Sequence, residues 1–226
     1  MPGVRARMTR AAVLVAAALV LAGCGYEHPG VAAVVGSQTI TDQQLDTVAH
    51  ALCSANRQGA GVSSLPSRGV RAGALSVLIR SELARQLGQA RHVQPDARQV
   101  SAALAQDEQN LRSLPKVDYQ PFRSALKGFA EGQLILLKVG KRSLEAQGHT
   151  NVTNNQALAE GSRILAAFEK KHPVTVDPRF GTYSNGAVHF QSGSLSVAES
   201  ARARAGAKAD PSSTWSATLP AAQTCS

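Results

Sequence analysis

Residues 31–45, VAAVVGSQTITDQQL, carry the clearest structural pattern in this chain. The first five are small or β-branched and favour a strand, and Gly36-Ser37 can turn the chain so that the next three residues return as a second strand. Thr41 and Gln44 have the spacing of a capping box, in which each side chain binds the other residue's backbone N–H. The stretch therefore predicts a β-hairpin that runs directly into a helix.

Apolar residues at helical spacing predict five helices, which proline and glycine residues separate. These helices are expected over residues 41–58, 67–92, 95–114, 119–147 and 154–172. Residues 174–176 follow as a short strand. The expected fold class is therefore mainly α with a small β-sheet. Residues 184–226 contain few large apolar side chains, and we interpret them as a low-complexity C-terminal segment with a weak helix or a mobile stretch over residues 198–209.

The N-terminal segment has the pattern of an export signal. Three arginines, Arg5, Arg7 and Arg10, precede the uncharged run of residues 11–23. A helix of this length reaches about 20 Å, which is too short for a hydrocarbon core of about 30 Å. The closing sequence LAGC, ending at Cys24, also resembles the lipobox of bacterial lipoproteins.

That resemblance implies a signal peptide over residues 1–23, cleavage before Cys24 and diacylation of its thiol. A membrane-anchored lipoprotein on the extracytoplasmic face would result, with residues 24–30 as its tether, because two acyl chains hold a protein stably at a membrane. The alternative is an ordinary cleaved signal whose last residue is a cysteine by chance.

Charge and cysteine content narrow the expected chemistry. The 226 residues have a formal net charge of +9, and the segment before Cys24 contributes three arginines and no acidic residue, which leaves +6 for the rest.

Apart from Cys24, the chain has two cysteines, Cys53 and Cys225, and such a pair can oxidise outside the cytoplasm. We predict a disulfide between them, worth on the order of 4–5 kcal/mol in the chain-entropy model. The alternative is two unpaired thiols.

No motif in the sequence indicates catalysis. The six histidines lack metal-ligand spacing, and the chain contains no phosphate-binding loop and no nucleophile elbow. We therefore expect no enzyme activity, no metal and no cofactor. We also expect no nucleic-acid partner, because no block of lysines and arginines is interleaved with aromatic residues.

Two stretches resemble a family of exported foldases. Residues 31–45 are similar to the Val-Asn-Gly hairpin and following helix that open the mature chains of the SurA and PrsA family. Residues 174–183, VTVDPRFGTY, resemble the family's strand after its last helix, with Asp177 and Phe180 as mild departures. That strand pairs with the N-terminal hairpin in the family, so the resemblance implies that residues 174–176 lie beside residues 31–35. The resemblance implies a SurA N-terminal-like helical chaperone domain over residues 31–183, closed by a C-terminal helix and strand.

The resemblance does not imply prolyl isomerase activity. Many family members carry a parvulin domain between their last two helices, whereas here only residues 148–152 separate them, and a domain of that size needs its own core. What carries over is a chaperone or holdase for unfolded or partly folded exported polypeptides. The alternative is a scaffold or binding subunit for one specific cell-envelope partner.

A chaperone of this kind needs exposed apolar surface with polar rims. Four side chains on the long helix expected over residues 119–147 are candidates for client binding. They are Phe122, Leu126, Phe129 and Leu136. The alternative for each of them is a place in the hydrophobic core.

Overall fold

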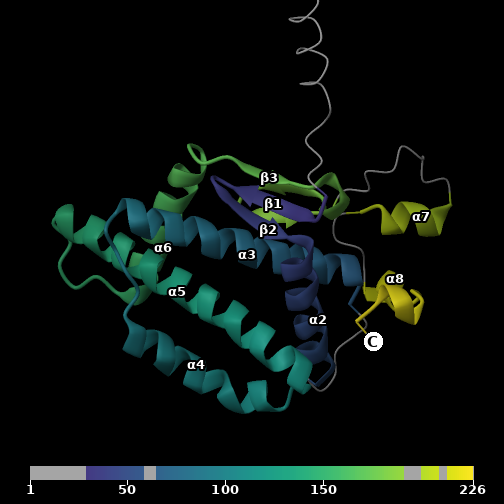
Figure 1. The fold of residues 1–226 in the computed structure, drawn as a ribbon. Helices are drawn as coiled ribbons and strands as arrows, with labels where there is room; N and C mark the ends of the chain where they lie inside the picture. The colour runs from purple at the N-terminus through teal and green to yellow at the C-terminus, as the bar shows by residue number, and fades with distance from the viewer. Residues whose placement is uncertain (1–28, 59–64, 191–199, 209–212, 226) are drawn as a thin grey trace, which may run out of the picture.

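A computed structural model describes residues 29–58, 65–190, 200–208 and 213–225 (Figure 1). This part of the chain is mainly helical with a small antiparallel sheet, as the sequence predicts. In chain order the elements are β1 (Val31–Val35), β2 (Gln38–Thr41), α2 (Asp42–Gln58), α3 (Ser67–Ala90), α4 (Ala97–Arg112), α5 (Lys116–Ala146), α6 (Asn154–Glu169), β3 (Val174–Val176), the 3-10 turn η1 (Pro178–Phe180), β4 (Thr182–Ser184), β5 (Ala187–His189), α7 (Ala201–Gly206), α8 (Ser213–Ser216) and η2 (Ala221–Gln223). The five long helices end within three residues of their expected bounds.

The three-stranded sheet joins segments that are far apart in sequence. β1 and β2 form an antiparallel hairpin, and Gly36 in its turn has φ of 60°, which glycine adopts without steric cost. β3 pairs antiparallel with the other edge of β1, so the strand order is β2-β1-β3 (Figure 1). The predicted pairing of residues 31–35 with residues 174–176 is confirmed.

Capping boxes begin two of the helices. At α2 the Thr41 hydroxyl accepts from the backbone N–H of Gln44 at 3.1 Å, and the Gln44 side chain accepts from the backbone N–H of Thr41 at 2.9 Å. Thr153 and Gln156 form the same pair of bonds at the start of α6. Both boxes satisfy N–H groups that a helix cannot pair internally, which explains why these helices begin where they do.

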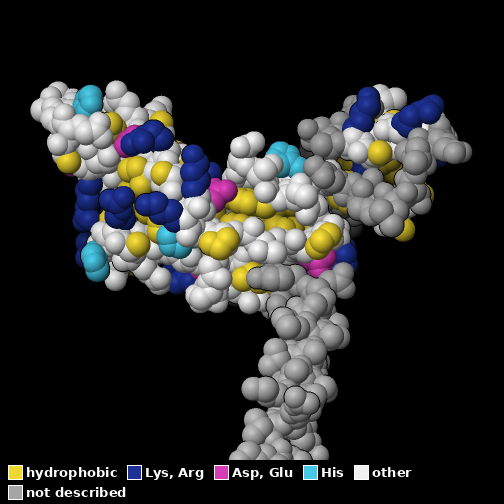
Figure 2. Space-filling view, turned by 90° about the horizontal axis from the view of Figure 1, so that it is seen from above, with side chains coloured by type: hydrophobic (Ala, Val, Ile, Leu, Met, Phe, Trp, Pro, Cys, Tyr) yellow, Lys and Arg dark blue, Asp and Glu magenta, His cyan; other side chains and the backbone are white. Residues whose placement is uncertain are grey.

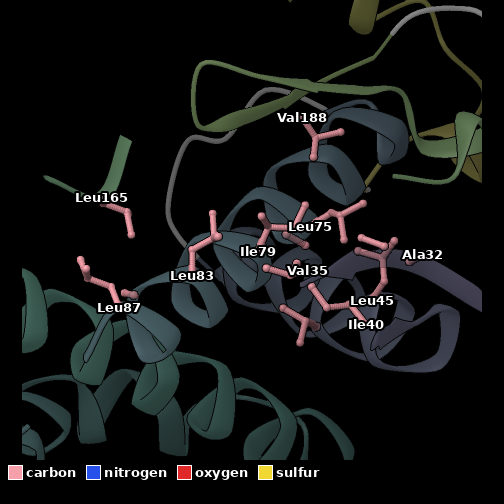
Figure 3. Close-up of a cluster of buried hydrophobic side chains, with 14 of the residues drawn as sticks. Ala32, Val35, Ile40, Leu45, Leu75, Ile79, Leu83, Leu87, Leu165 and Val188 are labelled. Atoms are coloured by element: carbon pink, nitrogen blue, oxygen red, sulfur yellow. The ribbon is translucent and has the colours of Figure 1, made fainter. Parts of the chain in front are cut away.

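α3 lies at the centre of the hydrophobic core (Figure 3). Its fully buried large side chains recur every four residues and so lie on one face of the helix. They are Leu75, Ile79, Leu83 and Leu87. Val35 of β1, Leu45 of α2 and Leu165 of α6 belong to the same cluster. The sheet and the helices therefore share one core along α3.

α5 and α6 approach each other closely because two glycines lie where they cross. A Cβ atom on Gly140 of α5 would collide with the backbone of Ala157 on α6. A Cβ atom on Gly161 of α6 would collide with the backbone carbonyl of Leu136 on α5. The absence of side chains at these two positions permits backbone-to-backbone packing.

The expected domain end at Tyr183 is wrong. It falls inside a hairpin of β4 and β5, in which Asn185 and Gly186 have φ of 52° and 78°. Val188 of this hairpin is 7% exposed and belongs to the core, and its N–H donates to the Ser76 hydroxyl on α3 at 2.8 Å. Asn-Gly is a strong hairpin signal, but the flanking strands of three residues are too short to show an apolar pattern.

The C-terminal segment is tied back to the main domain. Cys53 of α2 and Cys225 lie at disulfide-bonding distance, with their Cα atoms 5.0 Å apart, as the sequence analysis predicts. The backbone N–H of Cys225 donates to the carbonyl of Leu65 at 2.9 Å. The Arg68 guanidinium of α3 stacks over the rings of Phe190 and Trp215, at 4.5 and 4.9 Å from their centroids.

Candidate functional site

A cleft of about 790 Å³ lies between β2, α2, α3 and α5. β2 and the first half of α2 form one side, α5 forms the opposite side, and α3 lies between them. Pro95, in the connection between α3 and α4, closes one part of the rim. Figure 1 shows how these four elements are arranged. The cleft is large enough to hold several residues of an extended chain or a small ligand.

Small side chains on α5 make room for this cleft. Ala125, Gly128 and Gly132 line it from α5, and Ile135 continues the same face of the helix. At Gly132 an added Cβ would lie 3.4 Å from the Cβ of Ala84, so α5 packs tightly on α3 there. At Gly128 the nearest atom to an added Cβ would be 4.0 Å away, so the helices have begun to separate. The cleft opens where this separation begins.

The three charged side chains that line the cleft are all paired within the protein. Arg85 donates two hydrogen bonds to the carboxylate of Glu82, at 2.8 and 2.6 Å, and this carboxylate raises the pKa of the Arg85 guanidinium above its ordinary value. Glu131 forms an ion pair with Lys127 at 2.7 Å. The other polar side chains in the wall are uncharged glutamine, threonine and serine. The wall therefore suits an uncharged occupant.

A cluster of polar side chains joins α2 to the start of α5. Asp118 is 3% exposed, accepts a hydrogen bond from the Ser54 hydroxyl of α2 at 2.6 Å, and lies 2.6 Å from Nδ1 of His50 on α2. A Ser–His–carboxylate nucleophile needs the hydroxyl bonded to the imidazole, but here the hydroxyl bonds to the carboxylate. The cluster holds α2 against α5, and sequence reasoning did not find it, because 64 residues separate Ser54 from Asp118.

The candidate client-binding residues lie elsewhere on α5. Phe129 is 41% exposed, while Phe122 and Leu126 are half-buried. Leu136 is 1% exposed and belongs to the core, so it cannot contribute to a binding surface, and the expectation for it is wrong. None of the four lines the cleft.

Helical geometry explains why the sequence analysis missed the cleft. The four candidates were chosen for their size, and they follow one stripe of α5, whereas smaller residues on the neighbouring stripe face the cleft. The signal that was present is the recurrence of Ala125, Gly128 and Gly132 at spacings of three and four residues. Cys24, the expected lipidation site, lies outside the described residues, as do most residues of the expected tether.

A second cavity of about 520 Å³ lies where the ends of α3 and α5 meet α6. Lys and Arg side chains gather at this end of the molecule (Figure 2). Arg163 at its rim pairs with Glu160 at 2.7 Å, and hydrogen bonds from Arg163 and Ser143 lower the pKa of Glu160 to about 2. Arg91 is the C-cap residue of α3, where a cation is favourable. Arg163 is therefore already paired and Arg91 lies at a helix end, so the larger cleft remains the better candidate site.

Comparison with known proteins identifies no related family or curated protein. No protein-family model matches the chain, and no curated protein matches it in sequence. Among the described residues, no group of His, Cys, Asp and Glu side chains could hold a metal ion. No helix in the described part of the chain is long and apolar enough to cross a bilayer.

Proposed function

We propose that this protein is a lipid-anchored chaperone, or holdase, that binds unfolded or partly folded exported polypeptides in the cleft between β2, α2, α3 and α5. The anchor is the acylated thiol of Cys24, which holds the cleft at the extracytoplasmic face of the membrane. The protein acts without prolyl isomerase activity. This proposal rests on the export signal and lipobox of the sequence together with the cleft.

The observation that carries the proposal is the chemistry of the cleft wall. An unfolded chain offers main-chain amides and a mixture of side chains, and a holdase must accept many such sequences. A wall with apolar side chains, uncharged polar groups and paired charges binds through burial of apolar surface and hydrogen bonds, neither of which requires a specific charge on the client. This combination supports loose sequence preference.

The test fills the cleft without disturbing the fold. Gly128→Leu adds a side chain that projects into the cleft, and a Cβ at this position meets no atom closer than 4.0 Å. Gly73→Leu is the matched control, because an added Cβ there meets no atom within 4 Å and the residue is exposed on α3 outside the cleft. Both changes replace a helical glycine and favour the helix.

We expect Gly128→Leu to weaken binding of a fluorescently labelled, reduced and carboxymethylated protein about tenfold or more, while Gly73→Leu binds as the unchanged chain does. Fluorescence anisotropy measures the affinity, and light scattering of a thermally unfolding client measures holdase activity. If the unchanged chain binds no unfolded polypeptide, the proposal is overturned, and the alternative of a subunit for one specific envelope partner gains support. Equal binding by both variants would exclude this cleft as the site.

A further inference from the structure

The cleft meets the sheet along the edge of β2. Gln38, Thr39 and Ile40 are consecutive, and all three line the cleft. Successive side chains of a strand point to opposite faces of the sheet, so a cavity against one face would be lined by alternate residues only. The strand order β2-β1-β3 places β2 at the edge, with β1 on its other side. The backbone of β2 is therefore exposed to the cleft.

The register shows which backbone groups point into the cleft. Val35 and Gln38 flank the two-residue turn and face each other, so they are the hydrogen-bonded pair that closes the hairpin. Hydrogen-bonded pairs alternate along an antiparallel ladder, so the N–H and C=O of Thr39 point away from β1.

The capping box supports this assignment. Thr41 is two residues after Thr39, so its N–H must point the same way, and it indeed binds the side chain of Gln44 at 2.9 Å instead of β1. Thr39 itself is exposed. Within the described part of the chain its N–H and C=O have no partner, so they offer a donor and an acceptor at the cleft.

We propose that an extended polypeptide binds in this cleft as an added strand on β2, exchanging two main-chain hydrogen bonds with Thr39. This inference rests on the proposed function and deepens it by naming the mode of binding. The occupant is a segment of extended chain with small or apolar, uncharged side chains. An uncharged segment suits this wall, because Glu82 and Glu131 are already neutralised by Arg85 and Lys127.

The opposite wall has room for such a strand. An added strand lies about 4.8 Å from its neighbour, and its side chains point alternately to the two faces of the extended sheet. Ala125 and Gly128 on α5 present almost no side chain toward the space beside β2. Main-chain pairing with a short edge and side-chain contact with α5 together give affinity with little dependence on sequence.

The test removes the main-chain donor from each partner in turn. Thr39→Pro deletes the outward N–H of β2, and proline is tolerated on an edge strand where the N–H faces away from the ladder. Asn154→Pro is the matched control, because Asn154 is the first residue of α6 and proline fits that position. The probe is an acetylated and amidated peptide of alternating serine and valine, compared with the same peptide N-methylated at its four central residues. Binding is measured with the full-length chain in phosphatidylcholine vesicles.

We expect N-methylation to weaken peptide binding up to about tenfold for the unchanged chain and for Asn154→Pro, since the peptide N–H that donates to the Thr39 carbonyl is lost. Thr39→Pro should weaken binding of the unmethylated peptide by a similar factor, since the N–H of residue 39 that donates to the peptide carbonyl is lost. N-methylation should then weaken binding further, because it removes the other bond. Equal affinity for both peptides in the unchanged chain would overturn main-chain pairing and leave the proposed function intact. If the unchanged chain binds neither peptide nor any unfolded protein, both proposals fail. The comparison of the two peptides remains decisive if Thr39→Pro does not fold.

Discussion

At the scale of single residues, glycine has two opposite roles in this chain. Gly140 and Gly161 lie where α5 and α6 cross, and neither position has space for a Cβ atom. Gly73 of α3 is a helical glycine with open space around it. The same substitution should therefore destabilise the protein at one kind of position and stabilise it at the other.

Gly161→Ala should lower the free energy of unfolding by about 1–3 kcal/mol, because the new methyl group pushes α6 away from the carbonyl of Leu136. Gly73→Ala should raise it by about 0.5–1 kcal/mol through helix propensity. Urea unfolding followed by circular dichroism compares the midpoints. A Gly161→Ala midpoint equal to that of the unchanged chain would contradict the close packing of α5 on α6.

At the scale of elements, the C-terminal tail is fastened to α2 and α3 by a small number of contacts. The Cys53–Cys225 pair spans 172 residues of sequence, and an isolated bridge between Pro66 and Thr224 lies beside it. Trp215 stacks on Arg68 and donates its indole N–H to the carbonyl of Arg202. The attachment of the tail to the domain therefore depends on the Cys53–Cys225 disulfide more than on burial of a large apolar face.

Cys225→Ser should lower the free energy of unfolding under oxidising conditions by about 2–5 kcal/mol, because the unfolded chain regains the entropy of a long open loop. Thermal unfolding with and without a reducing agent measures this effect. Under reducing conditions the variant and the unchanged chain should unfold together. Equal midpoints in the oxidised samples would mean that the bridge contributes nothing to stability.

At the scale of the whole molecule, one core extends from Ala32 of β1 to Val188 of β5. Residues from 200 onward contribute nothing to this cluster in the part of the chain that the structure describes. β3 and the β4–β5 hairpin complete the core although they come after the last long helix. We therefore expect the domain to fold without its tail but not without its closing strands.

A chain that ends after residue 199 should still unfold in one cooperative transition, at a midpoint lowered by about as much as Cys225→Ser lowers it. A chain that ends after residue 172 should fail to fold cooperatively, because the outer edge of β1 and the α3 surface beneath Val188 are uncovered. Circular dichroism during heating distinguishes the two. Cooperative unfolding of the shorter chain would show that β3 is not needed to close the domain.

Much of the fold followed from short stretches of sequence. The hairpin at Gly36, the capping box at Thr41 and the bounds of the long helices depend on residues a few positions apart, so the sequence predicts them. The pairing of residues 31–35 with residues 174–176 was expected only from the resemblance stated in the sequence analysis and not from a local pattern. The β4–β5 hairpin did not, since its strands are too short to carry a pattern.

The cleft could not be read from the sequence, because its walls come from four elements whose relative placement depends on packing along α3. Which stripe of α5 faces the cleft, and that Leu136 is buried while Phe129 is exposed, depends on how α5 meets α3 and α6. Local chemistry settles where the helices and the β1–β2 hairpin begin and end, since their backbone hydrogen bonds join residues that are close in sequence. Only the packed molecule brings the free edge of β2 opposite the small residues of α5, because that juxtaposition depends on contacts between residues about ninety positions apart.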